Sequence, residues 1–194
     1  SYCSNHSLSI ARQLEAAATL ADLHSAMRDM ESLVTTLVTQ GIKTPQLARL
    51  VQVLNAQLMA RLWQMTATPA VVAGSPLLAL GSEGRGEQIL KTDQDNALIL
   101  AEGLDEKEVG LSANSFTERM LSLGYPPCPG NMMVNQPLWR HTIRGWEQTL
   151  RQWADSPQGE GLMHLAIFLD AETVSGPASW LEACRKALRS ALHD

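Results

Sequence analysis

The first part of the chain carries apolar residues at the spacing of amphipathic helices. From Leu20 onward they recur at alternating steps of three and four, which places them on one helix face that Gly41 would end. Thr44 followed by Pro45 is a typical helix start, and a second stripe follows it. Residues 1–70 are therefore predicted to form a helical bundle, whose stripes either pack in a core or form a coiled-coil surface for a partner. The stripes consist of Leu23, Met27, Met30, Val34 and Leu37, then of Leu47, Leu50, Val51, Leu54, Leu58 and Leu62.

Shorter apolar runs follow, and they predict strands interleaved with helices. VVAGSPLLALG at 71–81 and TDQDNALIL at 92–100 predict strands, and GRGEQIL between them predicts a short helix. Helices first and mixed elements afterwards indicate an α+β fold, with a second domain over 71–194. The remaining predictions are a helix over 105–123 ended by Gly124, a loop over 126–134 that runs into a brief strand, a helix from about Leu138, the longest strand over 161–170, and a last helix from Ala178.

Composition narrows the range of functions. A chain of 194 residues with 45% hydrophobic residues can bury a core, and its net charge of −5 gives no basic field to attract nucleic acid. No uninterrupted apolar run approaches the roughly 20 residues that a membrane-spanning helix needs. Three scattered cysteines without a CxxC pair argue against a disulfide framework or a zinc site, and the histidines form no HExxH pattern. These features fit a globular protein of the reducing cytoplasm, with neither nucleic acid nor membrane as a partner.

The segment GSEGRGE lies where a predicted strand passes into a predicted helix. Backbone N–H groups at a helix start can bind an anion with help from the helix dipole. Gly81 and Gly84 would let a phosphate approach the main chain, Ser82 adds a hydroxyl donor, and Arg85 adds a planar cation. Taken alone, the segment could also be a glycine-rich turn with a capping serine.

The segment TDQDN opens the next predicted strand. Asp93 and Asp95 are two positions apart, and residues at that spacing project from the same face of a strand. Two converging carboxylates are costly unless a cation neutralises them, and hard oxygen ligands suit Mg²⁺ or Mn²⁺. Alone, TDQDN could be an Asx turn. In this order, the two segments together predict a phosphate and metal site.

GSEGRGEQ followed by TDQDNALI resembles a family of nucleotidyltransferases related to the PII-protein uridylyltransferases and to the DNA-polymerase-beta-like superfamily. GYPPCPGNMMVNQPLWR, the later Trp146 and Trp153, and FLD followed by Val174 and Gly176 look like later blocks of that family. The resemblance thus extends to about residue 180. It implies that the N-terminal bundle lies beside a small mixed β-sheet of the polymerase-beta type.

The resemblance also implies a reaction. A nucleoside monophosphate would pass from an NTP to an acceptor such as a bacterial signalling protein, with Mg²⁺ or Mn²⁺ held by Asp93 and Asp95. Gly81 and Ser82 would hold the phosphates, with Arg85 nearby. Asp170, at the end of the predicted strand 161–170, would be the third carboxylate of the metal site, unless it merely ends that strand.

Relatives differ from this chain in the domains that flank the nucleotidyltransferase module and in one sequence motif. They usually follow CBS or cyclic-nucleotide-binding domains and continue into further C-terminal helices, so we expect such domains in the full-length protein and a truncation at Asp194. Where relatives commonly show Asp-x-Arg-Pro and a later Gly-Asp, this chain has Glu172 two positions after Asp170, and Pro177 after Gly176. An anion in place of a cation would weaken a phosphate contact, so a regulatory module that binds nucleotide and metal without turnover is the alternative. A purely structural interaction domain would leave the carboxylate pair unexplained.

Further residues have two interpretations each. The tryptophans at 139, 146 and 153 share one helix face, which is typical of a core but could also stack on a base. Three arginines would be solvated unless one reaches the triphosphate, and two asparagines flank a loop that could read the base or the acceptor. These are Arg140, Arg144 and Arg151, then Asn131 and Asn135.

Overall fold

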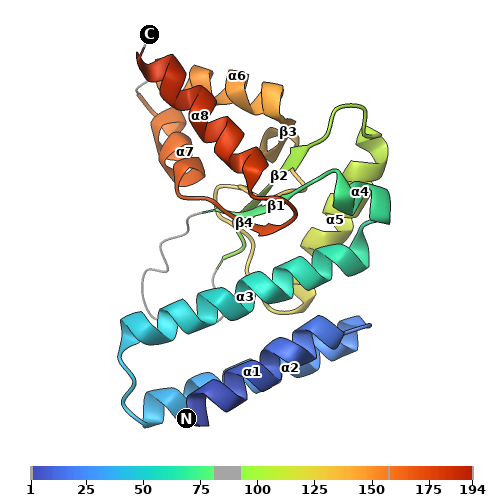
Figure 1. Cartoon of the computed structure of the whole chain (residues 1–194), viewed down its shortest axis with the longest axis vertical. Coiled ribbons are helices and arrows are strands. Elements are labelled where there is room, and N and C mark those ends of the chain that lie inside the picture. Colours follow the sequence, from blue (N-terminus) through green and yellow to red (C-terminus); the bar gives the residue numbers. More distant parts are fainter. Residues whose placement is uncertain (1, 81–92, 157, 194) are drawn as a thin grey trace.

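The computed structural model describes residues 2–80, 93–156 and 158–193. Three helices at the N-terminal end pack against one another and lie together at one end of the molecule (Figure 1). They are α1 (Tyr2–Ala16), α2 (Leu20–Thr39) and α3 (Thr44–Thr66). The two helices that the apolar stripes predict are thus confirmed, and α1 precedes them.

Helix α2 begins and ends where its local sequence indicates. Thr19 and Asp22 form a capping box, in which each side chain accepts a hydrogen bond from the other residue's backbone N–H. At the other end Gly41 has φ +78°, and the N–H of Ile42 reaches back to the carbonyl of Leu37 over 3.1 Å. This arrangement satisfies carbonyls of the last turn and confirms Gly41 as the stop.

A four-stranded mixed sheet lies at the centre of the fold. Its strands are β1 (Leu77–Ala79), β2 (Asn96–Leu100), β3 (Arg140–Thr142) and β4 (Glu172–Ser175). The order is β3-β2-β1-β4, with β1 antiparallel to both β2 and β4, and β3 parallel to β2. Ala79 pairs with Asn96 on one side and with Glu172 on the other. The end of β1 therefore lies beside the starts of β2 and β4, and the predicted α+β class is confirmed.

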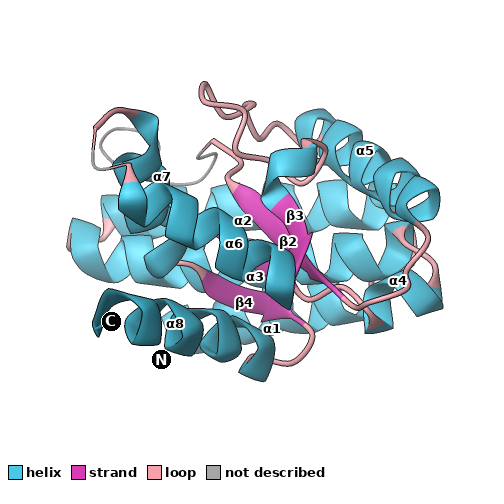
Figure 2. Ribbon diagram, turned by 90° about the horizontal axis from the view of Figure 1, so that it is seen from above, coloured by secondary structure: helices cyan, strands magenta, loops and turns pink. Residues whose placement is uncertain are grey.

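Helices cover both faces of this sheet (Figures 1 and 2). Leu77 and Leu98 point into a core that they share with the N-terminal helices and α5. The alternate residues Leu78, Ala97 and Ile99 point into a second core with α6, α7 and α8. The apolar stripes of α2 and α3 are buried in the first core, so core packing is the correct interpretation. The remaining helices are α4 (Pro69–Ala73), α5 (Glu106–Ser122), the 3₁₀ turn η1 (Pro137–Trp139), α6 (Ile143–Asp155), α7 (Glu160–Leu169) and α8 (Ser179–His193).

The predicted strand over 161–170 is wrong, because this segment forms helix α7. Its buried residues His164, Leu165 and Phe168 follow helical spacing, whereas Leu162 and Met163 are each 51% exposed. A short apolar run does not distinguish a strand from a half-buried helix, and here the packing against α6 decided for the helix. The predicted end of a strand at Asp170 is accordingly the C-cap of α7.

Three smaller predictions also need correction. Residues 71–73 belong to the short helix α4, whose N-cap Thr68 and following proline set its start, so β1 begins only at Leu77. The brief strand into which the loop over 126–134 was expected to run is separated from it by η1 and occurs as β3. The helix expected from Leu138 begins at Ile143, since the residues before it pair with β2.

The helices over 105–123 and from Ala178 are confirmed as α5 and α8. None of the helices in the described ranges combines the length and apolar composition that a bilayer crossing requires. The division into domains over 1–70 and 71–194 stays a prediction.

Candidate functional site

The four predicted phosphate-binding residues, Gly81, Ser82, Gly84 and Arg85, lie outside the described residues. The structure describes the chain on both sides of this segment, up to Leu80 and again from Asp93. The backbone N–H of Leu80 donates to the carbonyl of Asp95 over 3.0 Å, which continues the pairing of β1 with β2. The residues that flank the predicted phosphate segment are therefore neighbours at one edge of the sheet.

Asp93 and Asp95 lie in an extended segment directly before β2, not on the strand itself. Gln94 between them is only 3% exposed and forms a parallel bridge to Pro127, with its N–H on the carbonyl of Pro126 at 2.9 Å. The two aspartates are half-buried. The charge of Asp93 contributes to a raised pKa at Asp95, so the two carboxylates influence each other electrostatically, and their convergence on one cation stays a prediction.

Burial is the main reason why the pKa of Asp95 is raised, with the nearby Asp93 adding to it. The polar thiol of Cys128 lowers this pKa and so acts in the opposite direction. The Oδ1 atom of Asp95 is buried and has no hydrogen-bond partner among the described residues. A buried, unpaired carboxylate oxygen beside a second carboxylate is costly on its own, and a hard cation would relieve that cost. The residues present therefore fit a Mg²⁺ or Mn²⁺ site.

The loop over 126–134 wraps against this segment. Besides the contact at Gln94, the N–H of Asn96 donates to the Met132 carbonyl at 3.0 Å, and the side-chain oxygen of Asn96 accepts from the Val134 N–H at 2.8 Å. Sequence reasoning missed Cys128, because a single cysteine outside a CxxC pair gives no metal or disulfide signal. Cys128 lies in the segment GYPPCPGNMMV, which resembles a block of the nucleotidyltransferase family, and that position could have marked it as a residue near the site.

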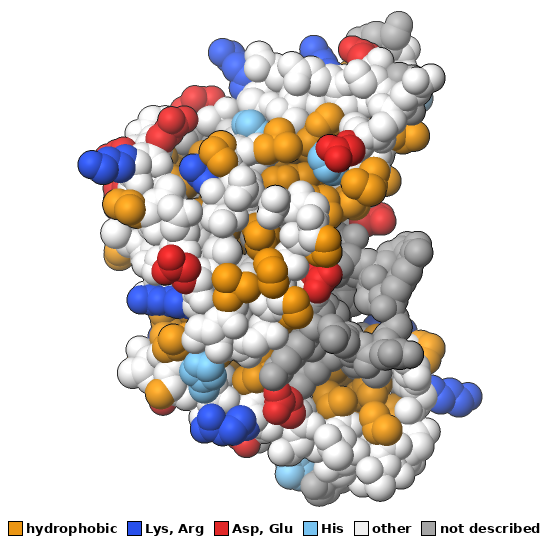
Figure 3. Space-filling model, turned by 180° about the vertical axis from the view of Figure 1, so that it is seen from behind, with side chains coloured by type: hydrophobic (Ala, Val, Ile, Leu, Met, Phe, Trp, Pro, Cys, Tyr) orange, Lys and Arg blue, Asp and Glu red, His pale blue; other side chains and the backbone are white. Residues whose placement is uncertain are grey.

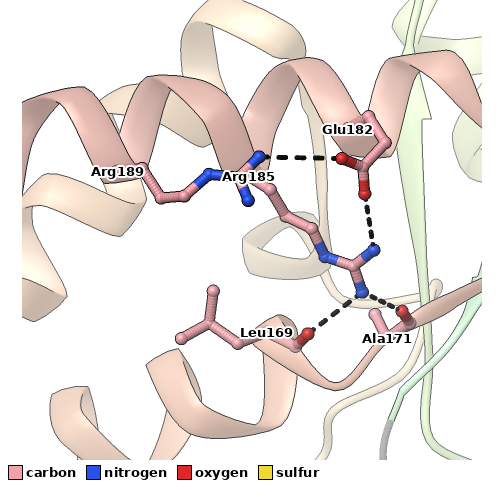
Figure 4. A network of polar contacts seen from close by, with 5 residues as sticks. All are labelled: Leu169, Ala171, Glu182, Arg185 and Arg189. Atoms are coloured by element: carbon pink, nitrogen blue, oxygen red, sulfur yellow. Dashed lines mark hydrogen bonds and ion pairs between the residues drawn. The ribbon is translucent and has the colours of Figure 1, made fainter.

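Asp170 lies at the same end of the sheet, two positions before β4, and its side chain is exposed. Arg185 of α8 donates through Nη2 to the carbonyls of Leu169, at 3.0 Å, and Ala171, the two residues that flank Asp170 (Figure 4). Within the described ranges, no three His, Cys, Asp or Glu side chains come close enough to hold one metal ion. Asp170 is therefore not brought into a triad with Asp93 and Asp95 in the described ranges.

The tryptophans belong to the core. Trp139 and Trp146 are 1% and 0% exposed, and Trp153 packs with its ring centroid 5.4 Å from that of Trp139. The indole N–H of Trp146 donates to the Leu98 carbonyl at 2.9 Å. A base-stacking role is therefore excluded for the two buried rings.

Of the three arginines, Arg144 and Arg151 are exposed, as expected for a solvated face. Arg140 is half-buried instead and donates to the Val134 carbonyl at 3.0 Å, and burial lowers its pKa. Asn131 is exposed with φ 56°, and Asn135 is half-buried. On the face drawn in Figure 3, the Lys and Arg side chains of the described residues lie apart from one another, in agreement with the net charge of −5.

A family model described as "Putative nucleotidyltransferase DUF294" matches residues 28–160, which is more than half of the chain. The chain belongs to this family. The DUF294 span starts within α2 and contains Asp93, Asp95 and Cys128, whereas Asp170 follows its end. The nucleotidyltransferase family that the sequence motifs indicate is thereby confirmed. Neither the curated proteins nor the solved structures gave a match.

Proposed function

We propose that this DUF294 chain transfers a nucleoside monophosphate from an NTP to an acceptor hydroxyl, for example on a signalling protein of the bacterial cytoplasm, with Mg²⁺ or Mn²⁺ bound at Asp93 and Asp95. The observation that carries the proposal is the half-buried Asp95 carboxylate. It has a second carboxylate beside it and one oxygen without a partner among the described residues. The backbone of Asp95 also pairs with that of Leu80, after which the predicted phosphate segment begins.

Each proposed site residue has a distinct task. Asp93 and Asp95 hold the cation, while Gly81, Ser82, Gly84 and Arg85 bind and orient the triphosphate. Asp170, at the same sheet edge, supplies a third carboxylate on the acceptor side. The chemistry that Mg²⁺ supplies when bound is neutralisation of charge on the triphosphate and on the leaving pyrophosphate.

The transfer balances without a further reactant. The acceptor oxygen forms a bond to the α-phosphorus, and the bond from that phosphorus to the oxygen bridging the β-phosphate breaks. The bonding electrons leave with pyrophosphate, and the hydroxyl proton passes to a nearby base or to water. What the protein contributes is alignment of the acceptor oxygen with the leaving group.

A second candidate is a regulatory module that binds nucleotide and metal without turnover, in a protein with CBS or cyclic-nucleotide-binding domains. Glu172 favours it. This exposed carboxylate opens β4 two positions after Asp170, where the resemblance leads us to expect a cation. Its negative charge would repel the phosphates at the edge where an arginine would attract them.

The test is calorimetric titration of the chain with each of the four NTPs, with and without Mg²⁺, followed by pyrophosphate release with candidate acceptors. The Asp93→Asn/Asp95→Asn double variant should lose metal-dependent NTP binding and keep its circular dichroism spectrum. Glu118→Gln/Asp155→Asn removes the same charge at exposed positions and should bind normally. Unchanged binding in the site variant would falsify the assignment, and binding without pyrophosphate release would favour the regulatory module.

A further inference from the structure

A buried tyrosine links the N-terminal helices to the segment that carries the two candidate metal ligands. Tyr125 follows the end of α5 and is 3% exposed. Its side chain belongs to the first core, and its hydroxyl donates a hydrogen bond to Oδ1 of Asn55 on α3 over 2.5 Å. The two residues are 70 positions apart in the sequence. Because a buried hydroxyl without a partner is costly, this hydrogen bond holds the tyrosine against α3.

Helix α3 lies between the other two N-terminal helices and the rest of the fold. It packs against α1 and α2 and also against α5, β1 and β4 (Figure 1). Asn55 lies near the middle of this helix, at a half-buried position. The acceptor of the Tyr125 hydroxyl is therefore carried by an element whose own position the N-terminal helices determine.

The residue after Tyr125 holds the chain between the two aspartates. The carbonyl of Pro126 accepts the backbone N–H of Gln94 at 2.9 Å, and Pro127 forms a parallel bridge with Gln94. Tyr125 is thus one peptide unit and one hydrogen bond away from Gln94. Two consecutive prolines restrict the backbone angles of this stretch, so a shift of Tyr125 is passed on to the Pro126 carbonyl.

The contact at Gln94 bears on how the two carboxylates are placed relative to one another. Asp95 is held from the sheet side, because its carbonyl accepts the N–H of Leu80 at 3.0 Å. Asp93 lies beyond Gln94, on the side away from β2. In extended chain the backbone of the middle residue sets how the side chains on either side of it project. The hydrogen bond from Gln94 to Pro126 therefore helps to set the orientation of Asp93 relative to Asp95.

We propose that Tyr125 is a positioning residue for the candidate metal site. Its hydrogen bond to Asn55 fixes the Pro126 carbonyl relative to α3, and this carbonyl in turn fixes the relative placement of the two aspartates. The inference rests on the proposed function, because it takes Asp93 and Asp95 to be metal ligands. Tyr125 acts through the main chain, so the N-terminal helices influence metal affinity by way of α3.

Mn²⁺ binding to the purified full chain, measured by electron paramagnetic resonance, tests this role without requiring an identified acceptor. Tyr125→Phe removes only the hydroxyl and should weaken Mn²⁺ binding about 3- to 10-fold. Asn55→Ala removes the acceptor of the same hydrogen bond and should have an effect of similar size. Because both variants break one shared contact, the double variant Tyr125→Phe/Asn55→Ala should bind Mn²⁺ no more weakly than the weaker of the two single variants.

Thr66→Val is the matched control for a loss of stability alone. Thr66 also lies on α3, and its hydroxyl accepts a hydrogen bond from Nη1 of Arg119 on α5 over 2.9 Å. Valine has nearly the same shape and removes this second polar contact between α3 and α5, which does not lead to the aspartates. The control should bind Mn²⁺ like the wild type, and urea unfolding of every variant shows how far their stabilities match.

The outcomes separate this role from the proposed function. If Asp93→Asn/Asp95→Asn abolishes Mn²⁺ binding while Tyr125→Phe binds like wild type, the positioning role is overturned and the metal site stands. The role is also overturned if Thr66→Val weakens binding as much as Tyr125→Phe does, or if the two single effects multiply in the double variant. If wild type binds no Mn²⁺, or the double aspartate variant binds it equally well, both proposals fail. Should Asn55→Ala fold poorly, the comparison of Tyr125→Phe with Thr66→Val decides.

Discussion

The backbone N–H of Leu80 donates to the backbone carbonyl of Asp95 over 3.0 Å. On its other side the chain around Asp95 is attached to the 126–134 loop through Gln94 and Asn96. The position of Asp95 is thus set by main-chain hydrogen bonds of its own residue and its neighbours. Its carboxylate can be changed without removing any of these bonds, which makes its electrostatic contribution measurable.

Asp95→Asn should stabilise the metal-free protein at pH 7 by roughly 0.5–1 kcal/mol. The folded chain raises the pKa of Asp95 above 3.8, so the folded state favours the protonated carboxyl. That contribution is present below 3.8 and is lost as the pH rises through the raised pKa. The gain from asparagine should therefore shrink on acidification through this window. Urea unfolding at pH 7 and at a pH below 3.8 measures the change in stability, with Asp155→Asn as an exposed control. A loss of stability at pH 7 would contradict the prediction.

Trp146→Phe should lower the free energy of unfolding by about 2–3 kcal/mol. The substitution removes the indole N–H that satisfies the Leu98 carbonyl in the central strand β2, and it leaves a small void at a fully buried position. Trp153→Phe, at a half-buried ring of the same cluster, should cost about 1 kcal/mol or less. Chemical denaturation of both variants checks the difference, and equal costs would show that the hydrogen bond contributes little.

Gly176→Ala should destabilise the fold by about 2–3 kcal/mol. Gly176 has φ +86°, and a Cβ there would lie 3.0 Å from the Cα of Pro76. Gly103 is the matched control, with φ +83° and no atom within 4 Å of the added Cβ. Its alanine variant should lose only about 1 kcal/mol from the backbone conformation. Thermal unfolding of the pair isolates the contact with Pro76, and the contact is unimportant if the two melting temperatures fall equally.

Arg185→Met should cost about 1–2 kcal/mol, because the carbonyls of Leu169 and Ala171 lose a charged donor at a position that is 27% exposed. Arg189→Met removes a charge that is 65% exposed and pairs with Glu182 at 3.7 Å. Solvent screens that pair, so its loss should cost less than about 0.5 kcal/mol. Urea unfolding compares the two. If Arg189→Met proves the more destabilising variant, the hydrogen bonds from Arg185 to the Leu169 and Ala171 carbonyls are not the main contribution of this cluster to stability.

Local sequence signals predicted those parts of the fold that depend on neighbouring residues. Gly41 was predicted to end α2 and does so through contacts within a few positions, and the capping box of Thr19 and Asp22, found in the structure, is equally local. In 161–170 the apolar run fits a strand and a helix equally well. Only its contacts with α6 and the second core decide for the helix.

The same contrast holds at the candidate site. Asp93 and Asp95 influence each other's charge because they are two positions apart along the chain, a spacing that the sequence alone reveals. The loop that carries Cys128 lies beside the chain around Asp95 only because Pro127 pairs with Gln94, and Arg185 reaches the chain around Asp170 from a helix that follows it. Such contacts depend on how distant segments meet, and no local pattern predicts them.

The topology of the sheet has a consequence for the order of folding. Ala79 pairs with Glu172 across roughly a hundred positions, whereas the contacts among α1, α2 and α3 and the pairing of β1 with β2 span much shorter stretches. On a ribosome, the bundle and the first strand pair are free to assemble while β4 is still being synthesised. The two neighbouring carboxylates would then be in place before the strand that follows Asp170 arrives to close the edge of the sheet.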